Sequence, residues 1–320
     1  MPTFIAKPTI TQLIARADSE ELIKYLEKAF TAYSAGSAVV PPVGTLSFDQ
    51  PRGDVHIKYG YIQDDAYYVI KIASGFYDNP AVGLPSSDGL MLVFDQKTGV
   101  LQTVLLDEGY LTDVRTALAG AIAARYLAPP NVNRIGMVGN GTQAALQLRY
   151  LKSVTDCRRV IVAGRSEEKL AEFKDQMAKE GFEIETTTDY GHLARQCNLI
   201  VTTTPAEAPL IMADDITPGT HITAVGADTV GKQELDEALL ERADLIVVDS
   251  TAQCQHHGEI HRAFQNNRLS RKEIKELGTI IAEGSIRRSP EAITVADLTG
   301  IATQDIQIAK FALEHLPPST

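Results

Sequence analysis

A short apolar run that breaks into two glycines constrains this chain more than any other feature. After a predicted strand at 134–138 come Gly139 and Gly141, and then helix-forming sequence. Gly139 allows a tight turn off the strand, and Gly141 lets the backbone approach a diphosphate with no Cβ in the way. The free N–H groups of the next helix would bind phosphate oxygens. The residues predicted to contact a dinucleotide here are Gly139, Asn140, Gly141, Thr142 and Gln143.

The next predicted strand, 159–164, ends where the dinucleotide fingerprint usually places an acid for the adenine ribose. Here Arg165 and Ser166 stand instead. A guanidinium and a hydroxyl suit a 2′-phosphate, so we expect NADPH to be preferred, with NAD as the other possible cofactor. In the alternative interpretation, Arg165 is a solvated loop residue and Ser166 is only the N-cap of the next helix.

From residue 134 onward, short β-type runs alternate with helical patterns, which predicts an α/β fold of the Rossmann type with a doubly wound parallel sheet. Ligands of such sheets bind at the carboxyl ends of the strands. That rule selects a further set of residues near the cofactor, namely Thr202, Thr203, Thr204, Pro205, Asp228 and Asp249.

Composition narrows the class of protein. A chain of 320 residues can form two domains, and its net charge of -11 argues against nucleic acid or an anionic membrane as partner. Three cysteines without Cys-x-x-Cys spacing indicate a reducing compartment. With no signal pattern or membrane-length apolar run, we expect a cytoplasmic protein.

The N-terminal part is predicted to be a second domain, of the α+β class. The runs 55–61 and 67–73 are typical of strands, and 90–94 and 100–106 predict a hairpin. Loops 75–80 and 83–89 are candidate active-site walls. An alanine-rich helix is predicted from Thr112 to Leu127, with Arg115 in its first turn, where the helix dipole disfavours a cation. Such a local conflict is often found where a site needs the charge.

Motifs distributed over nearly the whole chain resemble the ornithine cyclodeaminase and mu-crystallin family. Those in loops 75–80 and 83–85 and in segment 109–113 look most like its branch associated with ectoine breakdown. The motifs that carry the family resemblance are Lys71 in its strand, Leu111–Ala117, Gly139–Ala144, Val225–Asp228, Lys232–Leu235, Leu298–Gly300 and Gln304–Asp305.

The resemblance implies a homodimer with residues 1–113 and 305–320 as the substrate-binding and dimerisation domain and 114–304 as the NAD(P)-binding domain. It implies that Lys71 and Arg115 hold the α-carboxylate of a small amino or imino acid and that Asp228 acts on its nitrogen. These roles suit the chemistry of the three side chains. It adds Val225, Thr299 and Gly300 to the expected cofactor contacts.

The chain departs from the cyclodeaminase pattern after its Val-Pro-Pro turn, where typical members have an arginine and this chain has Val43. Lys58 or His56 could supply the missing charge as a substrate-binding residue. Without such a replacement, the substrate differs from ornithine.

Three functions therefore compete. The leading hypothesis is an NAD(P)-dependent imine (ketimine) reductase or amino-acid dehydrogenase, in which hydride moves between nicotinamide and the α-carbon. The first alternative is a cyclodeaminase that releases ammonia without net redox change. The second is a binding protein without catalytic activity.

Each catalytic candidate also has a structural interpretation. Arg115 could pair with Asp113 or Glu108, Lys71 could be an edge-strand lysine that reaches solvent, and Asp228 could be a turn residue.

His257 and His261 have helical spacing but no accompanying carboxylate pattern, so we expect a solvated face and no metal. Cys254 is expected to be a small buried residue and not a nucleophile.

Overall fold

The computed structural model describes residues 1–76, 78–270 and 272–316, so Tyr77 of the predicted loop 75–80 lies outside the described residues. The chain divides into two compact units. We call Met1–Arg115 with Ile301–Thr320 the N-terminal unit and Thr116–Gly300 the inserted unit. The sequence placed the two divisions after residues 113 and 304.

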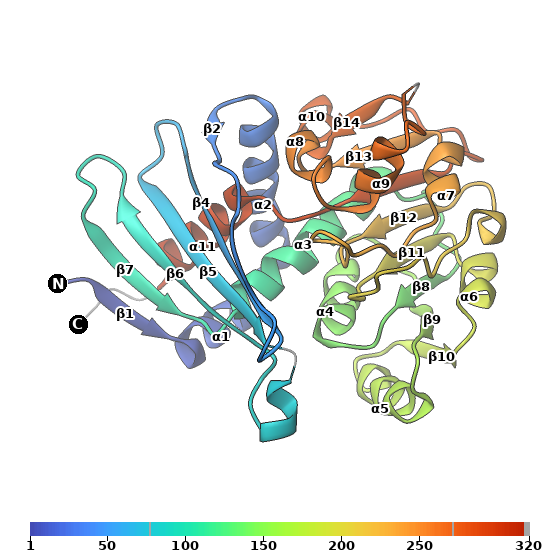
Figure 1. Ribbon diagram of the computed structural model, residues 1–320, viewed down its shortest axis with the longest axis horizontal. Helices are drawn as coiled ribbons and strands as arrows, with labels where there is room; N and C mark the ends of the chain where they lie inside the picture. Colours follow the sequence, from blue (N-terminus) through green and yellow to red (C-terminus); the bar gives the residue numbers. More distant parts are fainter. Residues whose placement is uncertain (77, 271, 317–320) are drawn as a thin grey trace. The chain divides into compact units, whose positions relative to one another are not determined.

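The inserted unit contains the predicted doubly wound sheet. Its eight strands, all paired in parallel, follow the order β10-β9-β8-β11-β12-β15-β13-β14. The chain moves outward from β8 through β9 to β10, and it returns on the other side of β8 with β11. Loops after β8 and β11 therefore diverge at the switch point of the sheet, where such folds bind nucleotides (Figure 1).

Alternating side chains of the strands bury two separate cores. In β9, Val160 and Val162 pack with α4 and α5, whereas Ile161 and Ala163 belong to the core that contains α6, α7 and α9. A strand buried on both faces has to be apolar throughout, which explains the continuous Val/Ile runs. The α/β prediction is confirmed.

The elements of the inserted unit, with α3 entering from the N-terminal unit, are α3 (Tyr110–Leu127), β8 (Ile135–Val138), α4 (Thr142–Leu151), β9 (Arg159–Ala163), α5 (Glu167–Ala178), β10 (Glu183–Thr187), α6 (Tyr190–Gln196), β11 (Leu199–Thr202), η2 (Ala213–Asp215), β12 (His221–Ala224), α7 (Glu237–Arg242), β13 (Leu245–Val248), α8 (Thr251–Cys254), α9 (Glu259–Gln265), β14 (Ile274–Glu276), α10 (Leu277–Glu283) and β15 (Thr294–Asp297).

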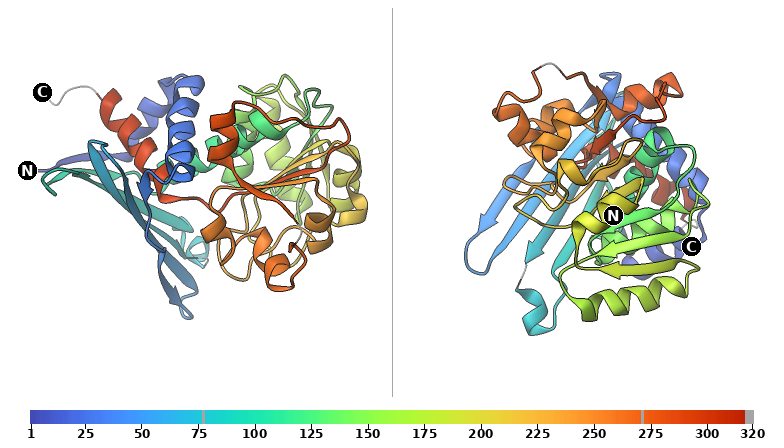
Figure 2. Two further views of the ribbon diagram at one scale, coloured as in Figure 1. Left: turned by 90° about the horizontal axis from the view of Figure 1, so that it is seen from above. Right: turned by 90° about the vertical axis from the view of Figure 1, so that its right-hand side faces the viewer.

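The N-terminal unit is a mostly antiparallel sheet of order β1-β7-β6-β5-β4-β2, with β3 also paired to β4. Helices α2 and α11 pack together and cover one face of it (Figure 2). The apolar face of α2, which includes Leu22, Leu26 and Phe30, is fully buried. Asp18 caps α2, accepting a hydrogen bond from the N–H of Glu20 at 3.2 Å.

The opposite face of this sheet carries no helix of the same unit within the described residues (Figure 2). Cross-strand neighbours Tyr59, Ile70 and Leu92 lie on it and are exposed or half-buried. Tyr68 and Phe94 stack there with ring centroids 4.7 Å apart. This open face is therefore largely apolar.

The elements of the N-terminal unit are β1 (Thr3–Ala6), α1 (Lys7–Arg16), α2 (Ser19–Ser34), β2 (Ala38–Val39), β3 (Gly44–Phe48), β4 (Gly53–Ile62), β5 (Tyr67–Phe76), η1 (Asn79–Val82), β6 (Ser87–Asp95), β7 (Leu101–Leu106) and α11 (Ala302–His315). Helix α1 was not predicted from the sequence. No helix in the described ranges combines the length and apolarity needed to span a membrane.

Candidate active site

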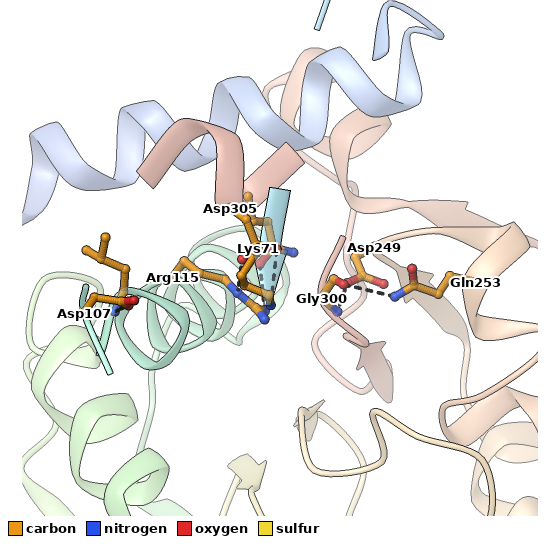
Figure 3. A network of polar contacts seen from close by, with 9 residues as sticks. Lys71, Asp107, Arg115, Asp249, Gln253, Gly300 and Asp305 are labelled. Carbon is orange, nitrogen blue, oxygen red and sulfur yellow. Dashed lines mark hydrogen bonds and ion pairs between the residues drawn. The ribbon is translucent and has the colours of Figure 1, made fainter. Parts of the chain in front are cut away.

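Two buried cations of the N-terminal unit converge on one carboxylate. Lys71 Nζ lies 3.3 Å from Asp305 Oδ2, and Arg115 Nε donates to Asp305 Oδ1 at 3.1 Å (Figure 3). Arg115 Nη1 also donates to Gln304 Oε1 at 3.3 Å. Lys71 and Arg115, which the sequence singled out separately, are thus brought together by α11.

The position of Lys71 follows from the sheet. Strand β5 is paired with β4 on one side and β6 on the other, so Lys71 is not an edge-strand residue, and that alternative is wrong. Its side chain is only 3% exposed. Strand alternation turns Lys71 toward α11, away from the open face that carries Ile70.

The setting of Arg115 also differs from expectation. Helix α3 begins at Tyr110, so Arg115 is beyond the first turn and the conflict with the helix dipole is weaker than expected. The carboxylate that pairs with Arg115 is Asp305, while Glu108 pairs with Lys7. The charge of Arg115 is held by a residue 190 positions away in the chain.

The electrostatics of this cluster bring Lys71 into the physiological range. Burial lowers the pKa of Lys71 to about 7, Asp305 opposes that change, and Arg115 and Lys58 add to it. Burial alone would raise the pKa of Asp305, but Lys71 and Arg115 lower it below its usual value. Lys71 can therefore gain or lose a proton near neutral pH, which suits a general acid or base.

Lys58 and His56 lie on β4. Lys58 is the direct cross-strand partner of Lys71 and is 8% exposed, so a third cation belongs to this buried cluster. His56 lies opposite Ala73, and its Nε2 is 3.3 Å from an oxygen of Asp54.

Asp305 is the residue that sequence reasoning missed as a participant, because it entered only as part of a family motif. A signal was available. An acid in the first turn of the C-terminal helix, preceding Ile306 and Ile308, suits the helix dipole but is costly to bury without cations nearby.

The glycine turn of the inserted unit matches the requirements of a dinucleotide. Gly139 has φ +107°, and a Cβ there would lie 2.6 Å from Thr203 Oγ1. Gly141 is the N-cap of α4, and a Cβ on it would meet nothing within 4 Å, so the space in front of the helix is open. Asn140 and Thr142 flank this opening. The residues present therefore fit a diphosphate at the N-terminus of α4.

The end of β9 is the predicted site of the adenine ribose. Ser166 is the N-cap of α5 and accepts the N–H of Lys169 at 3.3 Å, as the structural alternative expected. Arg165 is exposed, and within the described ranges it makes no hydrogen bond or ion pair.

Asp228 lies just after β12 in the inserted unit, so it belongs to a different unit from Lys71 and Arg115. Its side chain is 47% exposed, and its Oδ1 lies 2.7 Å from Lys232 Nζ. This ion pair lies in a turn region near Gly231, which has φ +95°.

The segment after β15 is fixed by a buried acid. Asp249 accepts hydrogen bonds from Thr299 Oγ1 at 3.0 Å and from the N–H of Gly300 at 2.6 Å (Figure 3). Gln253 donates to the Gly300 carbonyl at 3.1 Å. Thr299 and Gly300, predicted cofactor contacts, are thus held rigidly at a strand end.

Cys254 is fully buried, and burial raises the pKa of its thiol well above the usual value, so it is not poised as a nucleophile. Within the part of the chain that the structure describes, no cluster of three or more His, Cys, Asp or Glu side chains could hold a metal. His261 Nδ1 instead lies 2.7 Å from the carbonyl of Gln255.

A hollow of about 700 Å³ lies elsewhere in the inserted unit. It is lined by residues around Pro129–Asn133 and Lys152–Cys157, at the amino ends of the strands. It contains none of the predicted cofactor contacts, in keeping with binding at the opposite edge of such sheets.

The comparisons with known proteins agree on one family. The model of the ornithine cyclodeaminase/mu-crystallin family matches residues 9–318. An uncharacterized cyclodeaminase of Sinorhizobium fredii is 40% identical over 92% of this chain and 90% of its own length.

Two solved structures are similar over nearly the whole chain. An archaeal alanine dehydrogenase dimer with bound NAD has a TM-score of 0.89 and 33% identity, covering 98% of this chain and 95% of that one. The Delta(1)-pyrroline-2-carboxylate reductase of Thermococcus litoralis, in complex with NADH and L-proline, has a TM-score of 0.90 and 26% identity, covering 98% and 97%.

The cluster makes a prediction about the protonation of Lys71. In an Asp305→Asn variant the pKa of Lys71 should fall below about 7 by at least about one pH unit, because the carboxylate that stabilises the ammonium is lost. The measurement is an NMR titration of lysines labelled at Cε, with the Lys71 signal assigned from Lys71→Met.

Asp65→Asn is the matched control, since it removes a carboxylate that pairs with Lys310 in the same unit. It should leave the Lys71 titration unchanged. A Lys71 pKa that is normal in the wild type, or insensitive to Asp305→Asn, contradicts the prediction.

Proposed function

The chain belongs to the ornithine cyclodeaminase/mu-crystallin family, and on that premise we propose that it is an NAD(P)-dependent oxidoreductase acting on CH–NH or C=N groups. It moves a hydride between the nicotinamide and the α-carbon of a small amino or imino acid, as an imine reductase or amino-acid dehydrogenase. The observation that carries the proposal is the buried Lys71–Arg115 pair, in a chain that also contains a dinucleotide-type glycine turn.

The cation cluster is suited to an α-carboxylate. Lys58, Lys71 and Arg115 are three cationic side chains grouped around the carboxylate of Asp305, so an anionic substrate group would compensate their charge. Arg115 offers a planar fork for two oxygens, and Lys71 adds a point charge. Asp305 keeps both side chains in place before substrate arrives, which reduces the ordering cost of binding. Typical family members have an arginine where this chain has Val43, and we assign the role of that positive charge to Lys58, with His56 nearby.

Proton transfer is assigned to Asp228. The bound cofactor supplies or accepts the hydride, and the nitrogen must gain a proton as the imine becomes an amine. Asp228 is half-exposed, so it can exchange protons with water between turnovers. Lys232 Nζ lies 2.7 Å from its Oδ1. Lys71, with its pKa near 7, is the second group able to release a proton near neutral pH.

NADPH is the proposed preferred cofactor. The carboxyl end of β9 presents the exposed guanidinium of Arg165 and the hydroxyl of Ser166 where an acid would select the ribose of NAD. The proposed contacts along the strand ends are Gly139, Asn140, Gly141, Thr142, Gln143, Thr203, Thr204, Pro205, Val225, Asp228, Thr299 and Gly300.

A cyclodeaminase remains the second candidate because the relative from Sinorhizobium fredii carries that name. It would use the same residues, but the hydride would first move from the substrate to the cofactor and would return to the substrate after ammonia leaves.

The proposed function is tested with Δ1-pyrroline-2-carboxylate and with ornithine. We expect reduced cofactor to be consumed in proportion to the imine, without ammonia release, and we expect Asp228→Asn to lower kcat at least about 100-fold because proton transfer is lost. Ammonia release from ornithine with no net cofactor change would instead identify a cyclodeaminase. No turnover of any amino or imino acid would contradict both.

Cofactor choice is tested at Arg165. Arg165→Asp should shift the ratio of affinities from NADPH toward NADH by about 10-fold or more, because a charge-assisted contact to the 2′-phosphate is replaced by repulsion. Lys174→Asp, an equivalent charge reversal on an exposed position of α5, should leave the ratio unchanged. The preference is refuted by equal ratios in the wild type and Arg165→Asp.

The proposed partner of the apolar open face is a second copy of the chain, as in the alanine dehydrogenase dimer to which it is similar. Ile70→Asp should convert a dimer to a monomer in sedimentation experiments, because a carboxylate would be buried between the copies. Val100→Asp changes an apolar residue that is 59% exposed in the β6–β7 turn and should remain dimeric. A monomeric wild type, or a folded Ile70→Asp dimer, would exclude this interface.

A further inference from the structure

One carboxylate joins the ends of two neighbouring strands in the inserted unit. Glu234 is fully buried, and its Oε1 accepts hydrogen bonds from the N–H of Thr204 at 2.6 Å and from Thr204 Oγ1 at 2.7 Å. Its Oε2 accepts Thr202 Oγ1 at 2.6 Å and the N–H of Gly226 at 3.0 Å. Thr202 ends β11 and Gly226 follows β12, so Glu234 bridges the two strand ends.

The bridge leaves no room for variation at Gly226. A Cβ on Gly226 would lie 2.3 Å from the carbonyl oxygen of Thr204 and 2.4 Å from Glu234 Oε2. The two loops therefore approach each other as closely as glycine permits, and the carboxylate fills the space between them.

Glu234 is itself held by a second acid. Glu259 accepts the N–H of Glu234 at 2.8 Å and that of Leu235 at 2.9 Å. Burial raises the pKa of Glu259 well above its usual value, and the neighbouring Glu234 adds to that effect. Burial raises the pKa of Glu234 to about 7. The four hydrogen-bond donors that contact its oxygens act in the opposite direction, because they stabilise the ionised form.

Glu234 lies outside any helix. Helix α7 begins only at Glu237, after Asp236 has capped it. Glu234 is an extended residue whose side chain turns inward to the strand ends.

We propose that Glu234 is a positioning residue for cofactor binding, because it fixes the spacing between the loop at Thr203–Pro205 and the loop at Val225–Gly226. The inference rests on the proposed function in one respect, that a nicotinamide cofactor binds at these strand ends. Glu234 acts through the loops, since all its described side-chain contacts are with Thr202, Thr204 and Gly226.

The test compares cofactor binding in the full-length wild type and Glu234→Gln, measured with NADPH and with NADH. The chain contains no tryptophan, so the fluorescence of the reduced nicotinamide reports binding with little protein background. An amide cannot accept all four hydrogen bonds, so the Kd for the cofactor should rise about 10-fold or more. The KM for the cofactor should rise likewise, while kcat at saturating cofactor changes much less.

A milder variant covers the case in which Glu234→Gln does not fold. Thr202→Val preserves the shape of a buried residue and removes one of the four donors, so it should raise the Kd in the same direction by a smaller factor. Its control is Thr223→Val on the adjacent strand β12, where the lost contact is the one between Thr223 Oγ1 and His221 Nε2, 3.0 Å apart. That control should retain the wild-type Kd.

The outcomes separate this inference from the proposed function. A wild type that binds neither NADPH nor NADH would remove the proposed function. If the wild type binds, an unchanged Kd in folded Glu234→Gln overturns the inference alone. Where Glu234→Gln does not fold, equal values of Kd in Thr202→Val and Thr223→Val overturn it.

Discussion

The ion pairs of Asp305 with Lys71 and Arg115 are the interaction on which the N-terminal unit depends. Either cation buried alone would be costly, and removing one member of a buried ion pair leaves the other uncompensated. The three residues come from a central strand, from helix α3 and from the C-terminal helix. The ion pairs therefore bring the last helix of the chain back to the first unit, in addition to the apolar packing of α11 on α2.

The inserted unit uses a buried carboxylate in a different way. Asp305 compensates cations, whereas the described side-chain partners of Glu234 are neutral N–H and O–H donors. Asp249 follows the pattern of Glu234 at the next strand ends, where it accepts from Thr299 and Gly300. Loops that start from three parallel strands would be free to move independently, and these acids tie them to fixed positions. A preorganised edge binds a ligand with less loss of conformational freedom.

What the sequence could predict was local. The turn at Gly139 depends on φ and on the absence of a Cβ at one position, and the alternation of strands and helices depends on nearby residues, so both were readable. The partner of Arg115 was not, because Asp305 is 190 residues away and only the return of α11 brings it close. The start of α3 at Tyr110 was missed although its cause is local, since Asp107 Oδ2 accepts the N–H of Leu111 at 2.7 Å.

The acids of the two units differ strongly in exposure. Asp305, Asp249 and Glu234 are almost completely buried and surrounded by donors or cations, so each fixes the position of the groups that it contacts. Such residues hold geometry. Asp228 differs from them because it is about half exposed, with Lys232 as an ionic partner. Lys71 is also buried, but its pKa of about 7 allows its charge to change near neutral pH.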